Sequence, residues 1–274
     1  MKTVGLTYDL KTDYEFKKDD PPDANAEFDH PSTIGVIASA IETCGFKVKK
    51  IGNASSLLEK IDKLDVDIVF NISEGLFGRN RESQVPILLE MADIPFVGAD
   101  ALTLSLTLDK IMAKKIFIAE GIPTPKFFEV KTPESLANTN HFKFPLIVKP
   151  RFEGSSKGLT DDSRVENADD LRKQVEYVVN TYKQPALIEE FISGQEFTVA
   201  IVGNDLPQVM PIVQIKIDGR LKLNDKFYTF ARIRSNRLEY ICPARIKKNL
   251  AKEISDLALK TYNAVECRDF GRVD

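Results

Sequence analysis

Histidine, cysteine and tryptophan are scarce in this chain of 274 residues. Tryptophan is absent, and the only two histidines, His30 and His141, leave histidine acid–base chemistry few candidates. The three cysteines, Cys44, Cys242 and Cys267, are odd in number, far apart and form no CxxC pair. This usage disfavours a disulfide framework and a zinc site, and it is typical of a reducing, cytoplasmic environment.

Long apolar runs are also missing. No stretch reaches the roughly 18 apolar residues of a membrane span, and the N-terminal MKTVGLTYDL lacks the apolar core of a signal peptide. We therefore expect a protein that is neither exported nor embedded in a membrane. The formal net charge of -3 gives no general attraction to nucleic-acid phosphates or anionic lipid, so we expect no nucleic-acid partner.

Strands and helices alternate over the first hundred residues. Apolar runs predict strands at residues 2–9, 46–52 and 66–72, and helical spacing covers residues 33–44 and 55–64. A glycine ends the first helix and a serine is expected to cap the second. The order β-α-β-α-β predicts a parallel sheet, so residues 1–98 are assigned to a small doubly wound α/β domain. Ligands of such sheets gather beyond the carboxyl ends of the strands, where TYDLKTDY and NISEGLFGRNRESQ lie.

The rest of the chain divides into two further units. One long helix is predicted from residue 101 to the stop signal EGIPTP, and strands near residues 126–130 and 144–150 precede a helix near residues 168–182. We assign residues 99–187 to this central unit. Residues 188–274 are richer in strands and contain a final amphipathic helix over residues 248–265.

A glycine- and serine-rich loop, KPRFEGSSKG, follows the apolar strand FPLIV. Pro150 and the glycines end the strand, and glycines let backbone N–H groups approach an anion. The loop matches neither GxxxxGK[ST] nor GxGxxG, so taken alone it fits a hairpin turn equally well. Lys110 and Lys149 each adjoin an apolar segment, where an ammonium group needs a partner such as phosphate or an exit to water.

Two carboxylate-bearing stretches also suit a nucleotide. The hinge in LIEEFISGQEFTVAIV can offer backbone groups to adenine, and a nearby glutamate can accept hydrogen bonds from both ribose hydroxyls. Arg272 and Asp274 lie two apart in a predicted strand and so share a face. The carboxylate suits Mg²⁺ and the guanidinium suits a developing oxyanion. Without any ligand, the glutamates would be exposed charges at strand ends, and Arg272 and Asp274 would be an ion pair on the surface of the sheet.

Five motifs occur in one order: IPFVG with LTLDKIMAKKIFIAEGIPTP, then FPLIVKPRFEGSSKGL, LIEEFISGQEFTVAIVG, FYTFARIRSNRLEYICPA and FGRVD. From about Pro86 onward the chain resembles the D-alanine:D-alanine ligases of the ATP-grasp superfamily. The resemblance implies an N-terminal doubly wound (pre-ATP-grasp) domain followed by a two-subdomain ATP-grasp fold. It also implies a cytoplasmic ligase that makes a dipeptide for peptidoglycan: a carboxylate attacks the γ-phosphate of ATP, and an amine then displaces phosphate from the acyl phosphate.

The same resemblance implies roles for individual residues, with ATP and Mg²⁺ as cofactors. Lysines would contact the phosphates, the glycine-rich loop would close over them, and the hinge would hold adenine and ribose. The ATP-binding candidates are Lys110, Lys149, Glu153, Gly154, Ser155, Ser156, Glu189, Glu190, Ile192, Glu196 and Arg232. Arg272 would stabilise the tetrahedral intermediate, Asp274 would ligate Mg²⁺, and Ser155 would lie near the amino-acid substrate.

Departures from the family pattern concern the amino-acid substrates. Where the family carries a lysine–tyrosine pair, this chain has Arg232 and then Ile233, which offers no hydroxyl group. The nearest candidate for the acid that receives the first amino acid's ammonium group is Glu27, with Asp29 as the alternative. NISEGLFGRNRESQ, with Glu74 and Glu82, replaces a histidine–glycine motif. An ATP-grasp ligase of different amino-acid specificity is therefore the alternative hypothesis.

The chain ends at Asp274, where family members continue with further Mg²⁺ ligands and with residues that hold the second amino acid. We therefore expect a truncated ligase, inactive or nearly so as residues 1–274 alone. A non-catalytic ATP-binding module is the alternative if the natural chain ends near Asp274. Since the family is commonly dimeric through its N-terminal domain, the resemblance also suggests a homodimer.

Overall fold

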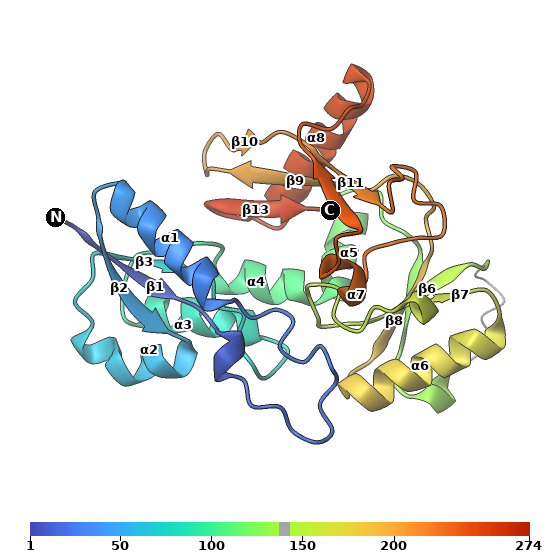
Figure 1. The fold of residues 1–274 in the computed structure, drawn as a ribbon, viewed down its shortest axis with the longest axis horizontal. Helices are drawn as coiled ribbons and strands as arrows, with labels where there is room; N and C mark the ends of the chain where they lie inside the picture. Colours follow the sequence, from blue (N-terminus) through green and yellow to red (C-terminus); the bar gives the residue numbers. More distant parts are fainter. Residues whose placement is uncertain (137–142) are drawn as a thin grey trace.

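The computed structural model describes residues 1–136 and 143–274, so His141 lies outside the described residues. Three sheets follow one another along the chain, and Figure 1 shows them as three units around a common centre. The mixed α/β class predicted from the sequence is therefore correct. Short 3₁₀ turns connect several elements, at Lys11–Asp13, Ile61–Lys63, Arg81–Ser83, Pro133–Ser135 and Asp161–Ser163.

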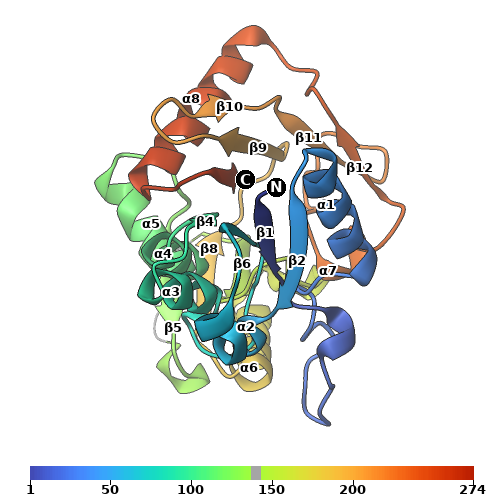
Figure 2. The ribbon, with the colours of Figure 1, turned by 90° about the vertical axis from the view of Figure 1, so that its left-hand side faces the viewer.

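The N-terminal sheet is parallel, as the β-α-β-α-β order predicts. Its strands are β1 (Thr3–Thr7), β2 (Lys47–Gly52), β3 (Ile68–Asn71) and β4 (Phe96–Val97), in the order β2-β1-β3-β4. Helix α1 (Pro31–Thr43) covers one face, and α2 (Ala54–Lys60) and α3 (Gln84–Met91) cover the other (Figure 2). The expected serine cap of α2 is wrong: the side chain of Asn53 caps the helix by accepting from the Ser56 amide at 3.0 Å.

The strand periodicity explains how both faces of this sheet are buried. Leu6 of β1 packs with Ile34 and Ala38 of α1, while Val69 of β3 packs with Leu57 and Leu89 on the opposite face. Successive strand residues point to opposite faces, so a parallel sheet covered by helices on both sides needs apolar residues at nearly every position. The carboxyl ends of β1 and β3 then open toward the rest of the molecule.

The predicted long helix is two helices, α4 (Ala101–Leu108) and α5 (Lys110–Ala119). Asp109 separates them in an extended conformation, with φ -81° and ψ 91°, and its side chain accepts from the amides of Ile111 and Met112 at 3.2 Å. Aspartate is a strong N-cap because it satisfies free amides in the first turn. The break puts Lys110 at the first position of α5.

The central sheet is antiparallel and carries the glycine-rich loop. Its strands are β5 (Phe127–Val130), β6 (Leu146–Pro150), β7 (Arg164–Val165) and β8 (Ala186–Glu190), in the order β5-β8-β6-β7. Helix α6 (Ala168–Tyr182) covers one face and shares a core with Val148 and Ile188. The whole of β8 pairs within this sheet, and the assigned unit boundaries at residues 98 and 187 stay predictions.

The C-terminal sheet is also antiparallel. It comprises β9 (Phe197–Val202), β10 (Gln208–Val209), β11 (Val213–Ile217), β12 (Leu238–Ile241) and β13 (Phe270–Val273), with β13 beside β9. Helix α8 (Lys248–Ala264) packs on one face, and a short helix, α7 (Phe230–Ile233), lies in the connection between β11 and β12. None of the helices in residues 1–136 and 143–274 is long and apolar enough to cross a membrane.

Contacts of the last unit with the two units before it close the molecule. The rings of Phe70 in β3 and Phe270 in β13 stack with centroids 5.8 Å apart. The Thr103 hydroxyl in α4 donates to the Val265 carbonyl at 2.9 Å, and the Gly98 amide donates to Asp269 at 2.9 Å. These contacts hold the start of β13 against the N-terminal sheet, and Arg272 and Asp274 lie at the other end of the strand.

Candidate active site

One glutamate of the central sheet pairs with two lysines at the centre of the site. Glu189 in β8 forms ion pairs with Lys149 in β6 and with Lys114 in α5, the latter at 2.7 Å. Burial acts to raise the pKa of Glu189, but the charges and hydrogen bonds of Lys149 and Lys114 outweigh it, and the net pKa is lowered. Lys114 is not among the residues predicted from the sequence, although its place one helical turn after Lys110 was a usable signal.

Lys110 lies close to the same charges. It is half-buried at the start of α5, and its ammonium group donates to the carbonyl of Glu153 in the glycine-rich loop. Burial, followed by the positive charge of Lys149, lowers the pKa of Lys110 to about 8. The structure therefore brings together the two lysines predicted to contact phosphate, which are 39 positions apart in sequence.

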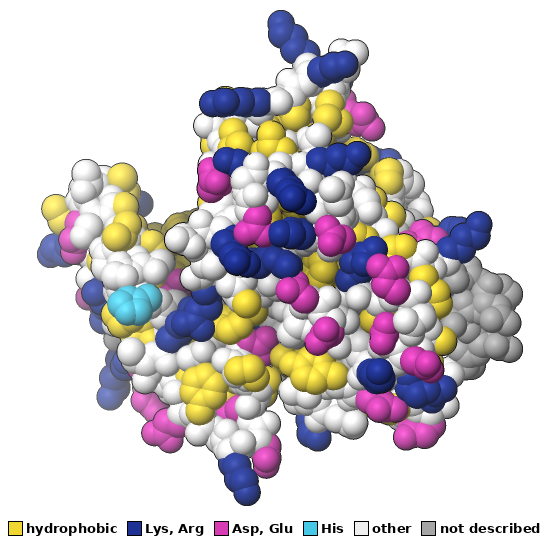
Figure 3. All heavy atoms as spheres, turned by 45° about the vertical axis from the view of Figure 1, so that its right-hand side comes forward, with side chains coloured by type: hydrophobic (Ala, Val, Ile, Leu, Met, Phe, Trp, Pro, Cys, Tyr) yellow, Lys and Arg dark blue, Asp and Glu magenta, His cyan; other side chains and the backbone are white. Residues whose placement is uncertain are grey.

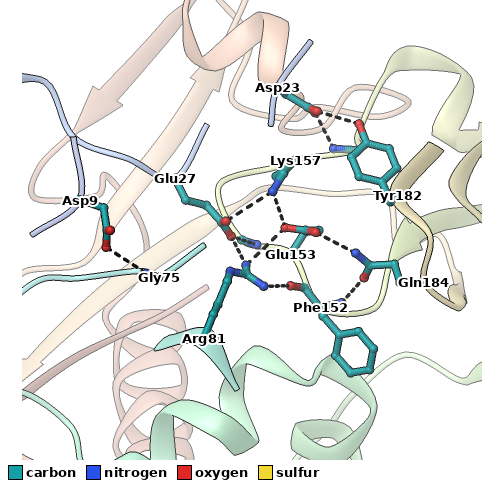
Figure 4. Close-up of polar contacts among 12 residues, drawn as sticks. Asp9, Asp23, Glu27, Gly75, Arg81, Phe152, Glu153, Lys157, Tyr182 and Gln184 are labelled. Atoms are coloured by element: carbon teal, nitrogen blue, oxygen red, sulfur yellow. Dashed lines mark hydrogen bonds and ion pairs between the residues drawn. The ribbon is translucent and has the colours of Figure 1, made fainter. Parts of the chain in front are cut away.

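The glycine-rich loop, residues 151–158, is held at both ends by carboxylates of the N-terminal unit (Figure 4). The amide of Gly154 donates to Glu27 at 2.5 Å, and the amide of Gly158 donates to Asp23 at 2.7 Å. Ser155 and Ser156, between them, have positive φ angles of 48° and 56°. The loop, which its glycines leave free to adopt many backbone conformations, is fixed by residues more than 120 positions away.

Four charged side chains, two from this loop and two from the N-terminal unit, form one network. Arg81 donates to Glu27 at 2.7 Å and to Glu153 at 3.3 Å, and Lys157 lies 2.9 Å from Glu153 and 3.7 Å from Glu27. Between 4% and 12% of each side chain is exposed, so the network is almost dry. Burial of charge is tolerable only when it is paired in this way. Glu27 is thus placed beside the loop, and its role as the acid that receives the substrate's ammonium group stays a prediction.

Two further carboxyl groups lie close to this network. Burial, followed by the negative charge of Glu82, raises the pKa of Glu74 to about 8. Burial also raises the pKa of Glu82 to about 7, although the charge of Arg81 opposes the shift. Burial also raises the pKa of Asp29. Glu74 and Glu82 lie after β3 in NISEGLFGRNRESQ, one of the two stretches predicted to face a ligand, whereas Asp29 lies in the segment before α1. In the described residues, no ion pair neutralises Glu74 or Glu82.

The other side of the site is formed by the C-terminal sheet. Arg272 pairs with Asp274 at 3.1 Å, and about two thirds of each side chain is exposed, which confirms that they share a face. Burial, and then the charge of Asp274, raise the pKa of Glu196 to about 7, while Lys149 opposes the shift. Glu196 therefore lies near both Asp274 and Lys149.

The carboxyl groups of Asp274 and Glu196 suit a hard cation. Magnesium prefers oxygen ligands and usually retains waters, binding through one or two carboxylates plus substrate phosphates. The exposed Asp274 carboxylate, with the Glu196 carboxyl group nearby, offers oxygen donors of that kind. Among the described residues, no group of three or more His, Cys, Asp or Glu side chains is placed to hold a metal by itself. The donors present therefore fit an ion shared with phosphates.

The remaining predicted residues occupy the rim. Glu190 lies 3.9 Å from Lys126, and Ile192 in the hinge is exposed. Arg232 in α7 pairs with Asp161 at 2.5 Å, which joins the connection after β11 to the central unit. Ile233 beside it is exposed and has no polar group. Figure 3 shows lysine and arginine side chains in the middle of one face, interleaved with carboxylates.

A cavity of about 450 Å³ lies elsewhere, between the edge of the N-terminal sheet and the turn before β13. Its lining includes Phe96, Asn204 and Arg268, and none of the predicted site residues. The site is therefore identified by the charged groups that converge from the loop, the hinge and β13, and not by this cavity.

Comparisons with known proteins agree with this architecture. The family model described as D-ala D-ala ligase C-terminus matches residues 116–274. The D-alanine–D-alanine ligase of Carboxydothermus hydrogenoformans is 36% identical over 253 residues, which are 88% of this chain and 76% of that protein. The uncharacterized protein y4sG of Sinorhizobium fredii is 32% identical over 246 residues, covering 87% of this chain and 71% of that protein.

Solved structures show the same fold. The D-alanine–D-alanine ligase of Bacillus anthracis complexed with ATP superposes with a TM-score of 0.72 at 20% identity, covering 100% of this chain and 81% of that chain. The VanG D-Ala:D-Ser ligase of Enterococcus faecalis superposes with a TM-score of 0.69 at 22% identity, covering 99% and 85%. At these identities the likeness establishes the ATP-grasp fold and nothing finer.

Proposed function

Because the chain belongs to the D-alanine–D-alanine ligase family, we propose that it activates an amino-acid carboxylate with ATP and couples it to a second amino acid. The family, the fold and the enzyme class predicted from the sequence, an ADP-forming ligase, are confirmed. Ligases of this family use ATP and Mg²⁺. The proposal adds the acyl-phosphate route, a D-alanyl-D-alanine-type dipeptide, its use in peptidoglycan and a cytoplasmic location.

One observation supports the proposal most strongly: Lys110, Lys149 and the loop of residues 151–158 lie together. Phosphoryl transfer leaves little covalent chemistry to the protein, which acts through positioning and neutralisation of charge on the phosphates. Two ammonium groups and a loop rich in backbone donors meet that requirement.

In this proposal both lysines exchange protein partners for phosphate. Lys110 leaves the Glu153 carbonyl and Lys149 leaves Glu189, while Lys114 remains to neutralise the buried Glu189 carboxylate. Without Lys114, the departure of Lys149 would leave an unpaired buried charge, which is strongly unfavourable. Lys114 is therefore proposed to permit the movement of Lys149.

The C-terminal sheet would serve the reacting groups. Arg272 projects from the same face as Asp274, where a guanidinium can stabilise negative charge on the tetrahedral intermediate. Asp274 would hold Mg²⁺, which when bound neutralises phosphate charge. Glu190 and Ile192 in the hinge would frame adenine, and Glu196 would accept from ribose; Ser155, Ser156 and Arg232 would contact substrate or phosphate from the loops.

The test is a coupled synthesis. The full-length protein is incubated with ATP, Mg²⁺ and each member of a panel of D- and L-amino acids; phosphate release is measured and products are identified by mass spectrometry. D-Alanine is expected to stimulate phosphate release and to yield D-alanyl-D-alanine. Absence of amino-acid-dependent phosphate release, with ATP still bound, would contradict the proposed reaction.

A ligase of different amino-acid specificity is the second candidate, and Glu27 favours it. The acid expected to receive the substrate's ammonium group is already paired with Arg81, and the loop position expected to supply a hydroxyl carries Ile233. The same panel separates the two candidates, since this one requires another amino acid to release phosphate where D-alanine does not.

A homodimer through the N-terminal unit is part of the proposal. Apolar side chains on its helices are exposed, including Val36, Leu58 and Met91. Light scattering after size-exclusion chromatography would give the mass of the assembly. A monomer at micromolar concentration would remove this part and leave the reaction untouched.

A further inference from the structure

Arg81 joins three segments that are far apart in sequence. Only 6% of its side chain is exposed, and its guanidinium donates to the Phe152 carbonyl at 2.7 Å, to Glu27 at 2.7 Å and to Glu153 at 3.3 Å. Figure 4 shows the side chain pointing up between Glu27 and the loop backbone. A planar guanidinium can make several such contacts at fixed angles, which an ammonium group cannot.

The backbone around Arg81 is itself constrained. Gly75, with φ 70°, passes so close that a Cβ atom would lie 2.4 Å from the Arg81 carbonyl oxygen. Asp9 at the end of β1 accepts from the amides of Glu74 and Gly75 at 3.0 Å, and Ser105 in α4 donates to Ser83 at 3.0 Å. Arg81 thus extends from a rigid base, so its position can dictate that of its partners.

The hydrogen bonds of Glu27 leave one of its oxygens available. Oε1 accepts from Arg81 at 2.7 Å and from the Gly154 amide at 2.5 Å, whereas Oε2 faces only the Lys157 ammonium group at 3.7 Å. Each carboxylate oxygen can accept two hydrogen bonds. Arg81 and Gly154 therefore saturate Oε1 and fix the direction of Oε2, which retains capacity for a donor from a ligand.

The charges facing Glu27 come from three elements. Arg81, Glu74 and Glu82 lie in the segment after β3, Glu153 and Lys157 lie in the glycine-rich loop, and Lys110 begins α5. Two of these, Arg81 and Glu153, are also bonded to each other. If Arg81 were replaced by a neutral residue, Glu27 and Glu153 would share Lys157 as their one positive partner in this network. Neither the Glu27 carboxylate nor the loop would then keep its geometry.

We infer that Arg81 is a positioning residue that sets the geometry of Glu27 and of the glycine-rich loop together, and thereby the affinity for the first amino acid. The inference rests on the proposed function in taking Glu27 as the receptor of that substrate's ammonium group. Arg81 acts through Glu27 and the Phe152 carbonyl and does not itself contact the reacting atoms.

The first experiment needs no catalysis. Amide hydrogen exchange is measured by mass spectrometry on the ligand-free full-length protein, comparing the wild type with Arg81→Gln, Arg81→Lys and the exposed control Arg172→Gln. Arg81→Gln is expected to accelerate exchange at least tenfold in peptides covering residues 152–158, because the Gly154 amide loses its fixed acceptor. The β6–β8 core and the control variant are expected to exchange as in the wild type.

The second experiment separates positioning from folding. With the amino acid that best supports phosphate release, Arg81→Gln is expected to raise KM for the first amino acid at least tenfold and KM for ATP less than threefold. Arg81→Lys keeps the positive charge but not the planar, several-armed guanidinium. Its KM for the first amino acid is therefore expected to lie between those of the wild type and Arg81→Gln.

Outcomes that would overturn the inference are defined for each arm. The inference is overturned if Arg81→Gln changes neither measurement: the rate of amide exchange in residues 152–158 and KM for the first amino acid would both stay within twofold of the wild type. If Arg81→Gln fails to fold, Arg81→Lys decides by the same criteria. If no amino acid supports phosphate release, the proposed function fails, while the exchange arm still tests whether Arg81 fixes the loop.

Discussion

The two sides of the site treat their charges differently. On the loop side, formed by Asp23, Glu27, Arg81, Glu153 and Lys157, the charged groups are buried and bonded to one another or to backbone amides. On the strand side, formed by Glu196, Arg272 and Asp274, the Arg272–Asp274 pair is exposed and the Glu196 carboxyl group has no hydrogen bond or ion pair in the described part of the chain.

This difference indicates which side changes when ligands bind. Breaking a buried pair costs several kilocalories per mole, whereas an exposed pair contributes little. The loop side is therefore preorganised by its own residues, and the strand side leaves its donors and acceptors available to nucleotide and metal. The loop that looks most flexible in sequence belongs to the more rigid side.

The largest expected effect comes from a lysine between the two sides. Lys110→Met removes an ammonium group proposed to neutralise phosphate, so kcat/KM for ATP in the full-length protein should fall by about 100-fold or more. Phosphate release measures it. Lys252→Met, which removes an exposed lysine paired with Asp256 on α8, is the control and should leave the rate unchanged. A loss below threefold for Lys110→Met would contradict the assignment.

The rigidity of the loop side can be broken through its backbone. At Gly158, φ is 80° and an added Cβ would lie 2.3 Å from Pro150, so Gly158→Ala should destabilise by about 3 kcal/mol through left-handed strain and overpacking. Gly219→Ala, at φ 75° with nothing within 4 Å, should lose only about 1 kcal/mol. Urea unfolding measures both, and equal losses would show that the loop is not tightly packed.

A smaller loss is expected when one acceptor of the loop is neutralised. Asp23 accepts from the Gly158 amide at 2.7 Å and from the Tyr182 hydroxyl at 2.8 Å. Asp23→Asn should lower the free energy of unfolding by about 1–2 kcal/mol, since charged acceptors make the stronger bonds. Asp256→Asn on α8 is the matched control, expected within about 0.5 kcal/mol of the wild type. Urea midpoints decide whether the two variants differ.

The pH dependence of stability involves Glu74, an acid beside the loop side that has no ion pair among the described residues. Burial, with the charge of Glu82, raises the pKa of Glu74 to about 8, so between about pH 4.5 and pH 8 the folded chain binds more protons at this group than the unfolded chain. This group's contribution to stability therefore decreases as pH rises through that window. Glu74→Gln should remove this decrease, so the stability of the variant should fall less than that of the wild type between about pH 4.5 and pH 8. Melting temperatures at several pH values measure it, and identical pH slopes would refute it.

Local pattern was enough to predict most of the fold. Apolar periodicity predicted β1 to β3 and their helices, and the order of five motifs indicated the family, because these signals lie within short stretches of chain. The same reasoning failed at Asp109, where continuous helical spacing hides a break. The Asp109 carboxylate, which caps α5, also accepts from Arg151 of the glycine-rich loop at 2.6 and 2.7 Å. Periodicity does not reveal this tertiary contact.

Sequence by itself determined the α/β class, the family and the presence of Lys110, Lys149 and the glycine-rich loop. Only the tertiary structure decided their partners: Arg81 for Glu27, Lys114 for Glu189 and Asp23 for Gly158. The physical reason is that charged side chains obey no period, and the pairs that bury them join residues from 54 to 135 positions apart. Such pairs form only after the apolar faces have brought the three units together.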